Sequence, residues 1–208
     1  MSDSAPQNRS AAEVPRKVLH LLVAVVPLLA VQWGQRITLM IALPTAILAV
    51  CADVLRSRNR KFEDFIQRWF GFMMRPSEES EGGRIVINGA TWVVISFALL
   101  IALFPLQIAA ASFLIFILGD AFAALVGQRI GRHTWPGGSR TIEGSVAFIV
   151  VGTLAAATFP GLSMWSAIPA VIVGALAEAL PWPLNDNIRV PLVVALTLAL
   201  IEYVPNLI

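Results

Sequence analysis

Apolar residues dominate this chain in seven long stretches, and short polar segments separate them. A transmembrane helix needs about 20 predominantly apolar residues, and each stretch approaches that length. The pattern therefore predicts an all-α integral membrane protein with about seven transmembrane helices. We expect a disordered tail over residues 1–15 and one polytopic membrane domain over residues 16–208. The predicted spans are Val18–Trp33, Ile37–Val54, Ile85–Phe104, Gln107–Gln128, Ile142–Phe159, Ser163–Leu180 and Ile188–Val204.

The composition supports this interpretation, and the basic residues predict an orientation. Charged residues make up 13% of the chain and hydrophobic residues 57%, whereas soluble domains carry about 25% charged residues. Lys and Arg are retained in cytoplasmic loops. With the N-terminus in the cytoplasm and the C-terminus outside, every basic residue except Arg36 lies on the cytoplasmic side.

We therefore expect a multi-pass protein of a bacterial cytoplasmic (inner) membrane, with its chemistry-bearing groups facing the cytoplasm. The surrounding lipid bilayer is its first partner. The apolar lateral faces leave room for a homo-oligomer, and no nucleic-acid partner is expected.

The longest polar connection, residues 56–84, contains a stretch with helical periodicity. Its apolar residues recur at intervals of three and four, which places them on one side of a helix. They are Phe62, Phe65, Ile66, Trp69, Phe70 and Met73. Such an interfacial amphipathic helix lies with its rings toward the lipid. It serves either as a plain membrane anchor or as a ledge that admits a lipid substrate sideways, and the sequence leaves both open.

Asp120 interrupts the fourth predicted span. A carboxylate near the centre of a transmembrane helix costs about 2.5–3.5 kcal/mol on insertion scales, so such residues are functional by default. Asp120, Ala124, Gly127 and Gly131 fall on one side of the helix, where small residues let another helix or a ligand approach closely. The alternative is a packing seam in which Asp120 forms a structural hydrogen bond.

The cytoplasmic loop over residues 129–141 has the composition of a phosphate-binding segment. Its polar side chains are Arg129, Arg132, His133, Thr134, Ser139, Arg140 and Thr141. Free N–H groups at a helix N-terminus attract phosphate, and arginine forks bind its oxygens. We expect Ser139 or Thr141 to cap the following helix, with Glu143 and Gly144 in its first turn. The alternative is an ordinary positive-inside loop before a capped helix.

Polar groups from four other spans reach the same membrane face. They are Lys17 and His20 in the first span, Asn88 and Thr91 at the third, Glu178 at the end of the sixth, and Asn185, Asp186 and Asn187 before the seventh. Mg²⁺ bridges one or two carboxylates to phosphates, and Asp120, Glu143 and Asp186 could supply the carboxylates. Together these residues predict a phosphoryl-transfer site. The alternative from another class is a small proton-coupled transporter with Asp120 and Glu178 as its relay.

At these positions the chain resembles the CTP-dependent lipid-alcohol kinase family, which includes dolichol kinases, phytol and farnesol kinases and the yeast-type diacylglycerol kinase. The motifs that carry the resemblance are Arg16-Lys17-Val-Leu-His20, Gly89-Ala90-Thr91-Trp92, residues 119–132, residues 139–145 and residues 185–191. They follow the family's order from the first span to the last. The chain departs from the usual Lys-Thr with Arg140-Thr141, and from the usual Asp-Asp-Asn with Asn185-Asp186-Asn187.

The resemblance implies a kinase that uses CTP as phosphate donor and Mg²⁺ as cofactor. The acceptor is a lipid alcohol, either an isoprenoid alcohol such as phytol, farnesol or a polyprenol, or diacylglycerol. Phosphatidate cytidylyltransferases share the Asp-containing helix and the Ser-basic-Thr-x-Glu-Gly loop, but their Pro-Gly-His-Gly-Gly segment does not occur in this chain. A cytidylyltransferase-like CTP transferase is thus the alternative within the same class of chemistry.

These expectations assign a role to each candidate residue. The catalytic set is Asp120, Glu143, Asp186 and His20. The nucleotide-binding set is Gly127, Arg129, Gly131, Arg132, Ser139, Arg140, Thr141, Gly144 and Lys17. The metal set is Asp120, Asp186 and Asn187. The supporting set is Asn88, Thr91, Glu178 and Asn185.

Overall fold

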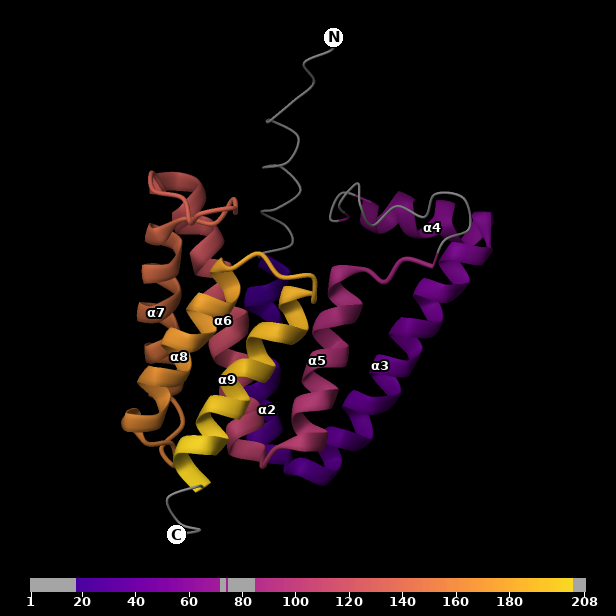
Figure 1. Cartoon of the computed structure of the whole chain (residues 1–208). Helices are drawn as coiled ribbons and strands as arrows, with labels where there is room; N and C mark the ends of the chain where they lie inside the picture. Colours follow the sequence, from indigo (N-terminus) through magenta and orange to yellow (C-terminus); the bar gives the residue numbers. More distant parts are fainter. Residues whose placement is uncertain (1–17, 72–73, 75–84, 204–208) are drawn as a thin grey trace.

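The regular elements of this computed structural model are all helices, and it describes residues 18–71, 74 and 85–203 (Figure 1). They are α2 (Val25–Trp33), α3 (Gln35–Arg58), α4 (Arg60–Phe70), α5 (Gly89–Leu103), α6 (Leu106–Ile130), α7 (Ile142–Ala156), α8 (Met164–Ala179) and α9 (Asp186–Tyr203). Residues 18–23 are also helical and join α2 through a turn at Ala24. The all-α prediction is confirmed for the described part of the chain.

Each predicted apolar stretch coincides with a helix, although the boundaries move by a few residues. The helix of the third predicted stretch, α5, begins at Gly89 rather than Ile85, because the side chain of Asn88 caps it. The last helix begins at Asp186, two residues earlier than predicted. Polar caps rather than the ends of the apolar runs therefore fix these helix starts.

Only two of the described helices are both long and apolar enough to cross a membrane by themselves, α3 and α6. The segment Val18–Trp33 and the helices α5, α7 and α8 are apolar but shorter. Large apolar side chains such as Met40, Leu48 and Trp165 are exposed on the outside of the bundle, as expected for a surface that contacts lipid. The fold is thus that expected of a membrane protein, while the count of seven spans and the orientation stay predictions.

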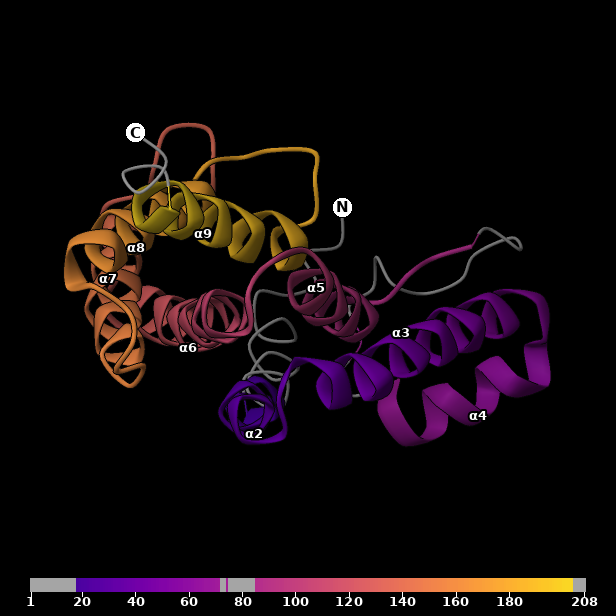
Figure 2. The same cartoon turned by 90° about the horizontal axis from the view of Figure 1, so that it is seen from below.

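α6 is the central helix of the molecule. Every residue from Ile108 to Ile117 is buried, because α2, α5, α7 and α9 all pack against this helix. Figure 2 shows α7, α8 and α9 grouped on one side of α6, and α5 and α3 on the other side. This packing brings α8 and α9 beside α6, although their residues lie far from it in the sequence.

α4 lies across the end of α3, away from the bundle (Figures 1 and 2). Asn59 caps it through hydrogen bonds from the backbone N–H groups of Lys61 and Phe62, and Phe65 and Trp69 are exposed. The predicted amphipathic helix therefore exists, although Met73 lies outside the described residues. Its location in the membrane interface stays a prediction.

Candidate functional site

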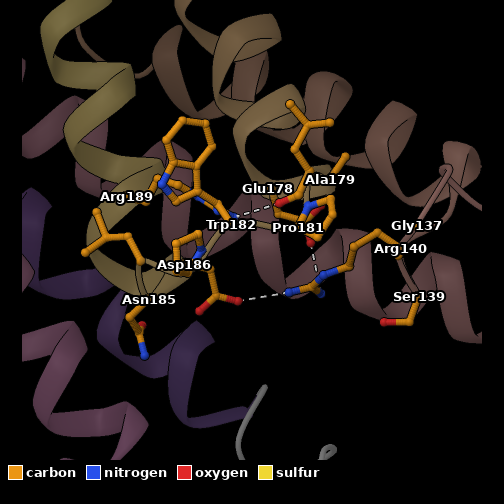
Figure 3. A pocket seen from close by; sticks show the side chains of 14 residues that line it. Gly137, Ser139, Arg140, Glu178, Ala179, Pro181, Trp182, Asn185, Asp186 and Arg189 are labelled. Carbon is orange, nitrogen blue, oxygen red and sulfur yellow. Dashed lines mark hydrogen bonds and ion pairs between the residues drawn. The ribbon is translucent and has the colours of Figure 1, made fainter.

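A polar pocket lies where the α6–α7 loop meets the connection between α8 and α9 (Figure 3). Its volume is about 450 Å³, within the size range of small-molecule sites in proteins. Three segments line it: Gly137–Arg140, Glu178–Asp186 and the side chain of Arg189. These segments are far apart in the sequence, and the contacts of α8 with α7 and α9 bring them together.

Arg140 connects two carboxylates in this pocket. Its Nη1 lies 2.9 Å from Oε1 of Glu178, and its Nη2 donates a hydrogen bond of 2.9 Å to Oδ2 of Asp186. The side chain of Glu178 is only 2% exposed, whereas those of Arg140 and Asp186 are 31% and 26% exposed. The guanidinium thus reaches from the buried end of α8 to the more open start of α9, as Figure 3 shows.

The start of α9 is fixed by its own side chains. The backbone N–H of Asn187 donates to Oδ1 of Asn185 and to Oδ1 of Asp186, each at 3.0 Å. The side-chain amide of Asn187 is buried and donates to the carbonyl of Gly89 at the start of α5. Asp186 therefore lies at the pocket wall, while Asn187 faces the neighbouring helix.

Arg189 lines the same pocket from the first turn of α9, on the side where Trp182 lies (Figure 3). Its Nη2 donates to the carbonyl of Leu180 at 3.1 Å. Its Nε and Nη1 atoms are buried and have no hydrogen-bond partner in the part of the chain that the structure describes. Our sequence reasoning gave Arg189 no role. Arg189 lies one helical turn after Asn185 and Asp186, and this spacing could have placed it beside them from the sequence alone.

Thr141, one of the two predicted caps, caps α7 by accepting a hydrogen bond of 3.1 Å from the N–H of Gly144. A Cβ added to Gly127 would lie 2.7 Å from the hydroxyl oxygen of Thr141, and one added to Gly131 would lie 2.6 Å from its methyl carbon. A Cβ on Gly144 would lie 2.8 Å from the carbonyl oxygen of Ala123. The small residues therefore let α6 and α7 pack closely, and their predicted contact with a nucleotide stays a prediction.

Glu143, in the first turn of α7, forms a separate pair with His133 of the α6–α7 loop. Its Oε1 lies 2.7 Å from Nδ1 of His133, and its Oε2 accepts a longer bond from the backbone N–H of His133. Arg129 and Arg132 are exposed at the end of α6 and do not line the pocket. Of the predicted phosphate-binding side chains, the structure brings only Ser139 and Arg140 into it.

His20 and Asp120 form a second buried polar pair. Nδ1 of His20 lies 3.5 Å from Oδ2 of Asp120, and the two residues are only 4% and 5% exposed. The ring of Phe116 meets the imidazole edge-on. The sequence predicted that both would belong to one site, and the structure brings them together. Lys17, predicted beside them, lies outside the described residues.

A third polar cluster joins α3 to α5, and sequence reasoning missed its acidic member. The two carboxylate oxygens of Asp53 accept hydrogen bonds from the backbone N–H and the side-chain amide of Asn88. Asn88 in turn accepts from the N–H of Thr91. Nε of Arg56 lies 3.6 Å from Asp53, and its Nη2 donates to the carbonyl of Val86. Asn88 and Thr91 thus support the packing of α3 against α5. The sequence signal for Asp53 was its position as an acid inside an apolar stretch.

The predicted metal ligands do not form one cluster. Among the described residues, no group of three or more His, Cys, Asp or Glu side chains is arranged to hold a metal ion. Asp186 lines the pocket, Asp120 pairs with His20, and Asn187 bonds to Gly89. The pocket and the His20–Asp120 pair are therefore two separate polar regions.

Comparison with known proteins gives informative similarities to kinases. No family model matches the chain, and no solved structure matches it significantly. The chain is 28% identical over 208 residues to a CTP-dependent diacylglycerol kinase of Schizosaccharomyces pombe, which covers 91% of this chain and 93% of that protein.

Two further kinases are similar. A phytol kinase of Synechocystis is 30% identical over 197 residues, which cover 88% of this chain and 77% of the kinase. A dolichol kinase of Saccharomyces cerevisiae is 32% identical over 83 residues, covering 36% of this chain and 16% of that enzyme. The similarities to the diacylglycerol kinase and to the phytol kinase each cover most of this chain.

Proposed function

The chain belongs to the lipid-alcohol kinase family, and we propose that it transfers the γ-phosphoryl group of CTP to the hydroxyl of a lipid alcohol at the cytoplasmic membrane face. The observation that carries the proposal is the pocket in which Arg140 lies between Glu178 and Asp186. It joins the loop expected to bind phosphate to the acidic start of α9. The CTP-dependent relative supports CTP as the donor.

In this proposal the nucleotide occupies the pocket over Gly137–Arg140. Its volume, about 450 Å³, and its charged side chains suit a water-soluble ligand that carries several charges. Ser139 lies at the pocket wall, whereas Arg129 and Arg132 lie outside it and would contact only phosphate groups that extend toward the end of α6. Phosphoryl transfer depends mainly on positioning and charge stabilisation, which such a site supplies.

The residues of the pocket fit Mg²⁺. The ion prefers oxygen ligands, and it is usually held by one or two carboxylates plus substrate phosphates rather than by a cage of protein groups. Asp186 offers a partly exposed carboxylate at the pocket wall, beside the side-chain oxygen of Asn185, so these two residues would hold the ion. When bound, the ion would offset negative charge on the phosphate oxygens.

The lipid hydroxyl meets the His20–Asp120 pair in this proposal. Asp120 lies ten residues before the end of α6, which is about 15 Å along the helix, and α9 also starts below the end of α6 (Figure 1). This proposal requires the pair and the pocket to lie at comparable depths. The hydroxyl oxygen forms the new bond to the γ-phosphorus, the bond to the β-phosphate oxygen breaks, and CDP leaves. The hydroxyl proton passes to His20 or Asp120.

The setting is the inner membrane of a bacterium, with the pocket facing the cytoplasm. This placement follows from the distribution of basic residues. α4 supports it, since its exposed rings would lie in the interface and its charged side in water. A lipid alcohol then reaches the site from the bilayer, and the nucleotide reaches it from the cytoplasm.

The test is a transfer assay with detergent-purified protein, Mg²⁺, γ-labelled CTP or ATP, and a panel of farnesol, phytol, a polyprenol and diacylglycerol. Labelled lipid with CTP supports the proposal and identifies the acceptor. Labelled lipid with ATP alone removes CTP as the donor. Pyrophosphate release from CTP and phosphatidate, without labelled alcohol, would indicate the cytidylyltransferase instead.

Asp120→Asn is the matched variant for this assay. Loss of a positioned proton acceptor costs about 10²–10⁴-fold in rate, so transfer should fall by at least that lower factor while the protein stays folded in detergent. Full activity of Asp120→Asn would remove Asp120 from the mechanism.

A further inference from the structure

The two arginines of the pocket differ in what surrounds their charge. Arg140 lies 2.9 Å from each of two carboxylates, Glu178 and Asp186. Arg189 has no carboxylate partner within the described part of the chain, and its only hydrogen-bond acceptor there is the carbonyl of Leu180. The positive charge of Arg140 is therefore already offset by protein groups, whereas that of Arg189 is not.

Two N–H donor atoms of Arg189 are also buried without an acceptor in the described part of the chain, which is unfavourable for the folded state. Nε and Nη1 are buried without a hydrogen-bond partner among the described residues, and a guanidinium has no protonation state in which these donors disappear. Unmet buried donors of a charged group are destabilising, and folded proteins leave few of them. An anion beside Arg189 would satisfy both its charge and its donors.

We propose that Arg189 binds a phosphate group in this pocket, and that Arg140 mainly holds the pocket together. The proposal rests on the proposed kinase function and identifies which cation contacts the phosphate. Phosphate is the group that fits, because its oxygens match the fixed donor geometry of a guanidinium. Two ligands carry it, the nucleotide and the phosphorylated lipid product.

The approach to Arg189 is through the α8–α9 connection. Pro181–Leu184 are exposed, and Trp182 is 66% exposed at the side of the pocket where Arg189 lies (Figure 3). The Nε and Nη1 atoms are shielded from solvent, so the proposal requires this exposed segment to shift before a phosphate reaches them. Binding should therefore change the environment of Trp182.

The first experiment measures binding without turnover. Equilibrium dialysis of labelled CTP with Mg²⁺ would be carried out on the full-length protein in detergent, for the wild type, Arg189→Gln, Arg189→Lys and Arg58→Gln. Arg58 is exposed at the end of α3, away from the pocket, and serves as the matched loss of one positive charge. The same proteins would be tested with the phosphorylated alcohol, and their thermal midpoints measured.

We expect Arg189→Gln to weaken CTP binding roughly 10- to 100-fold, the loss of one or two charge-assisted hydrogen bonds. Arg189→Lys should recover part of that loss, and Arg58→Gln should bind like the wild type. The thermal midpoint of Arg189→Gln should not fall, because the substitution removes the buried donors Nε and Nη1, which have no partner among the described residues. If Arg189→Gln does not fold, the comparison of Arg189→Lys with the wild type decides the same point.

Other results would separate this inference from the kinase proposal. A change in affinity for the phosphorylated alcohol alone would support phosphate binding by Arg189 and identify the product as its source. Wild-type affinity of Arg189→Gln for both ligands would overturn the inference, even if transfer is observed. CTP binding that depends on Arg189 without transfer to any alcohol would leave the inference standing and overturn the kinase. No binding by the wild type would overturn both.

Discussion

Arg56 and Arg140 both lie beside carboxylates, and their surroundings differ in an instructive way. Arg56 is 2% exposed near the end of α3, where it contacts Asp53 of the same helix and the carbonyl of Val86 before α5. Arg140 is 31% exposed at its side chain and lies in a pocket between Glu178 and Asp186. Both pair with carboxylates. Only Arg140 combines that pairing with a space that a ligand can enter.

The difference teaches that an ion pair alone does not indicate a functional site. A buried pair that is fully enclosed can only support the fold, and its net stabilisation is small because desolvation offsets the attraction. A pair at a pocket wall can hold the shape of a space that a ligand enters. Substitutions in the two clusters should therefore affect different quantities, stability for Arg56 and ligand binding for Arg140.

The largest effect is expected for Arg56→Gln. Breaking a buried ion pair by removing one partner costs about 3–5 kcal/mol, because the other charge stays buried. The free energy of unfolding in detergent should fall by that order, and the transfer rate of the remaining folded protein should change little. Denaturant titration and an assay normalised to folded protein measure the two quantities. A loss of activity without a loss of stability would break the comparison.

Arg140→Gln should act on function through the shape of the pocket, because Arg140 holds Glu178 and Asp186 in place. We expect its KM for the nucleotide to rise and its kcat/KM to fall by about 100-fold, which corresponds to roughly 3 kcal/mol. Stability should also fall, although less than for Arg56→Gln, since Asp186 is partly exposed and can be hydrated. Arg140→Lys keeps the charge but cannot contact both carboxylates in the same way, so it should recover only part of the activity. Unchanged kinetics in Arg140→Gln would place the site elsewhere.

Asn88→Ala tests the enclosed cluster from its other side. The substitution removes the cap of α5 and one donor to Asp53. Loss of such a cap costs about 1 kcal/mol, and the unmet carboxylate adds to that cost. We expect a destabilisation of about 2 kcal/mol, measured by denaturant titration, with normal nucleotide affinity. Asn88→Asp, which keeps the capping oxygen, should not serve as a rescue because it places a second carboxylate beside Asp53.

The smallest effect is expected at Thr141, which caps α7 beside the pocket. Thr141→Ser keeps the capping hydroxyl and should be nearly neutral, whereas Thr141→Ala should lose about 1 kcal/mol of stability. The methyl group of Thr141 packs closely against Gly131, so a small loss in Thr141→Ser reports that contact. Thermal unfolding of both variants measures the difference. Equal losses would mean that the cap contributes nothing.

Much of the fold could be predicted because apolar runs and helix caps are local signals. The apolar stretches, the helical character of residues 60–70 and the cap at Thr141 were all readable from nearby residues, and each is confirmed as a helix or a cap. Spanning of the membrane could not be established in the same way. α5 and α7 are shorter than a full span, and only length and composition bear on the question.

The site was only partly predictable, since it depends on which helices become neighbours. The pairing of Arg140 with Glu178 joins residues of the α6–α7 loop and α8, and no local pattern gives that choice. Asp53 carried the same signal as Asp120, an acid inside an apolar stretch, and was overlooked. The glycines at 127 and 131 were interpreted mainly through a ligand, while the structure places a threonine against them.

The short helices have a consequence for the surrounding bilayer. α7 has 15 residues and α8 has 16, so each rises only about 22–24 Å, less than the roughly 30 Å of a typical hydrocarbon core. In the predicted membrane arrangement, a bilayer beside such helices would thin, or polar groups at the helix ends would sink below the headgroups. Either arrangement would bring water down toward the hydroxyl group of a membrane lipid. The alcohol would then react without leaving the layer in which its hydrocarbon chain is soluble.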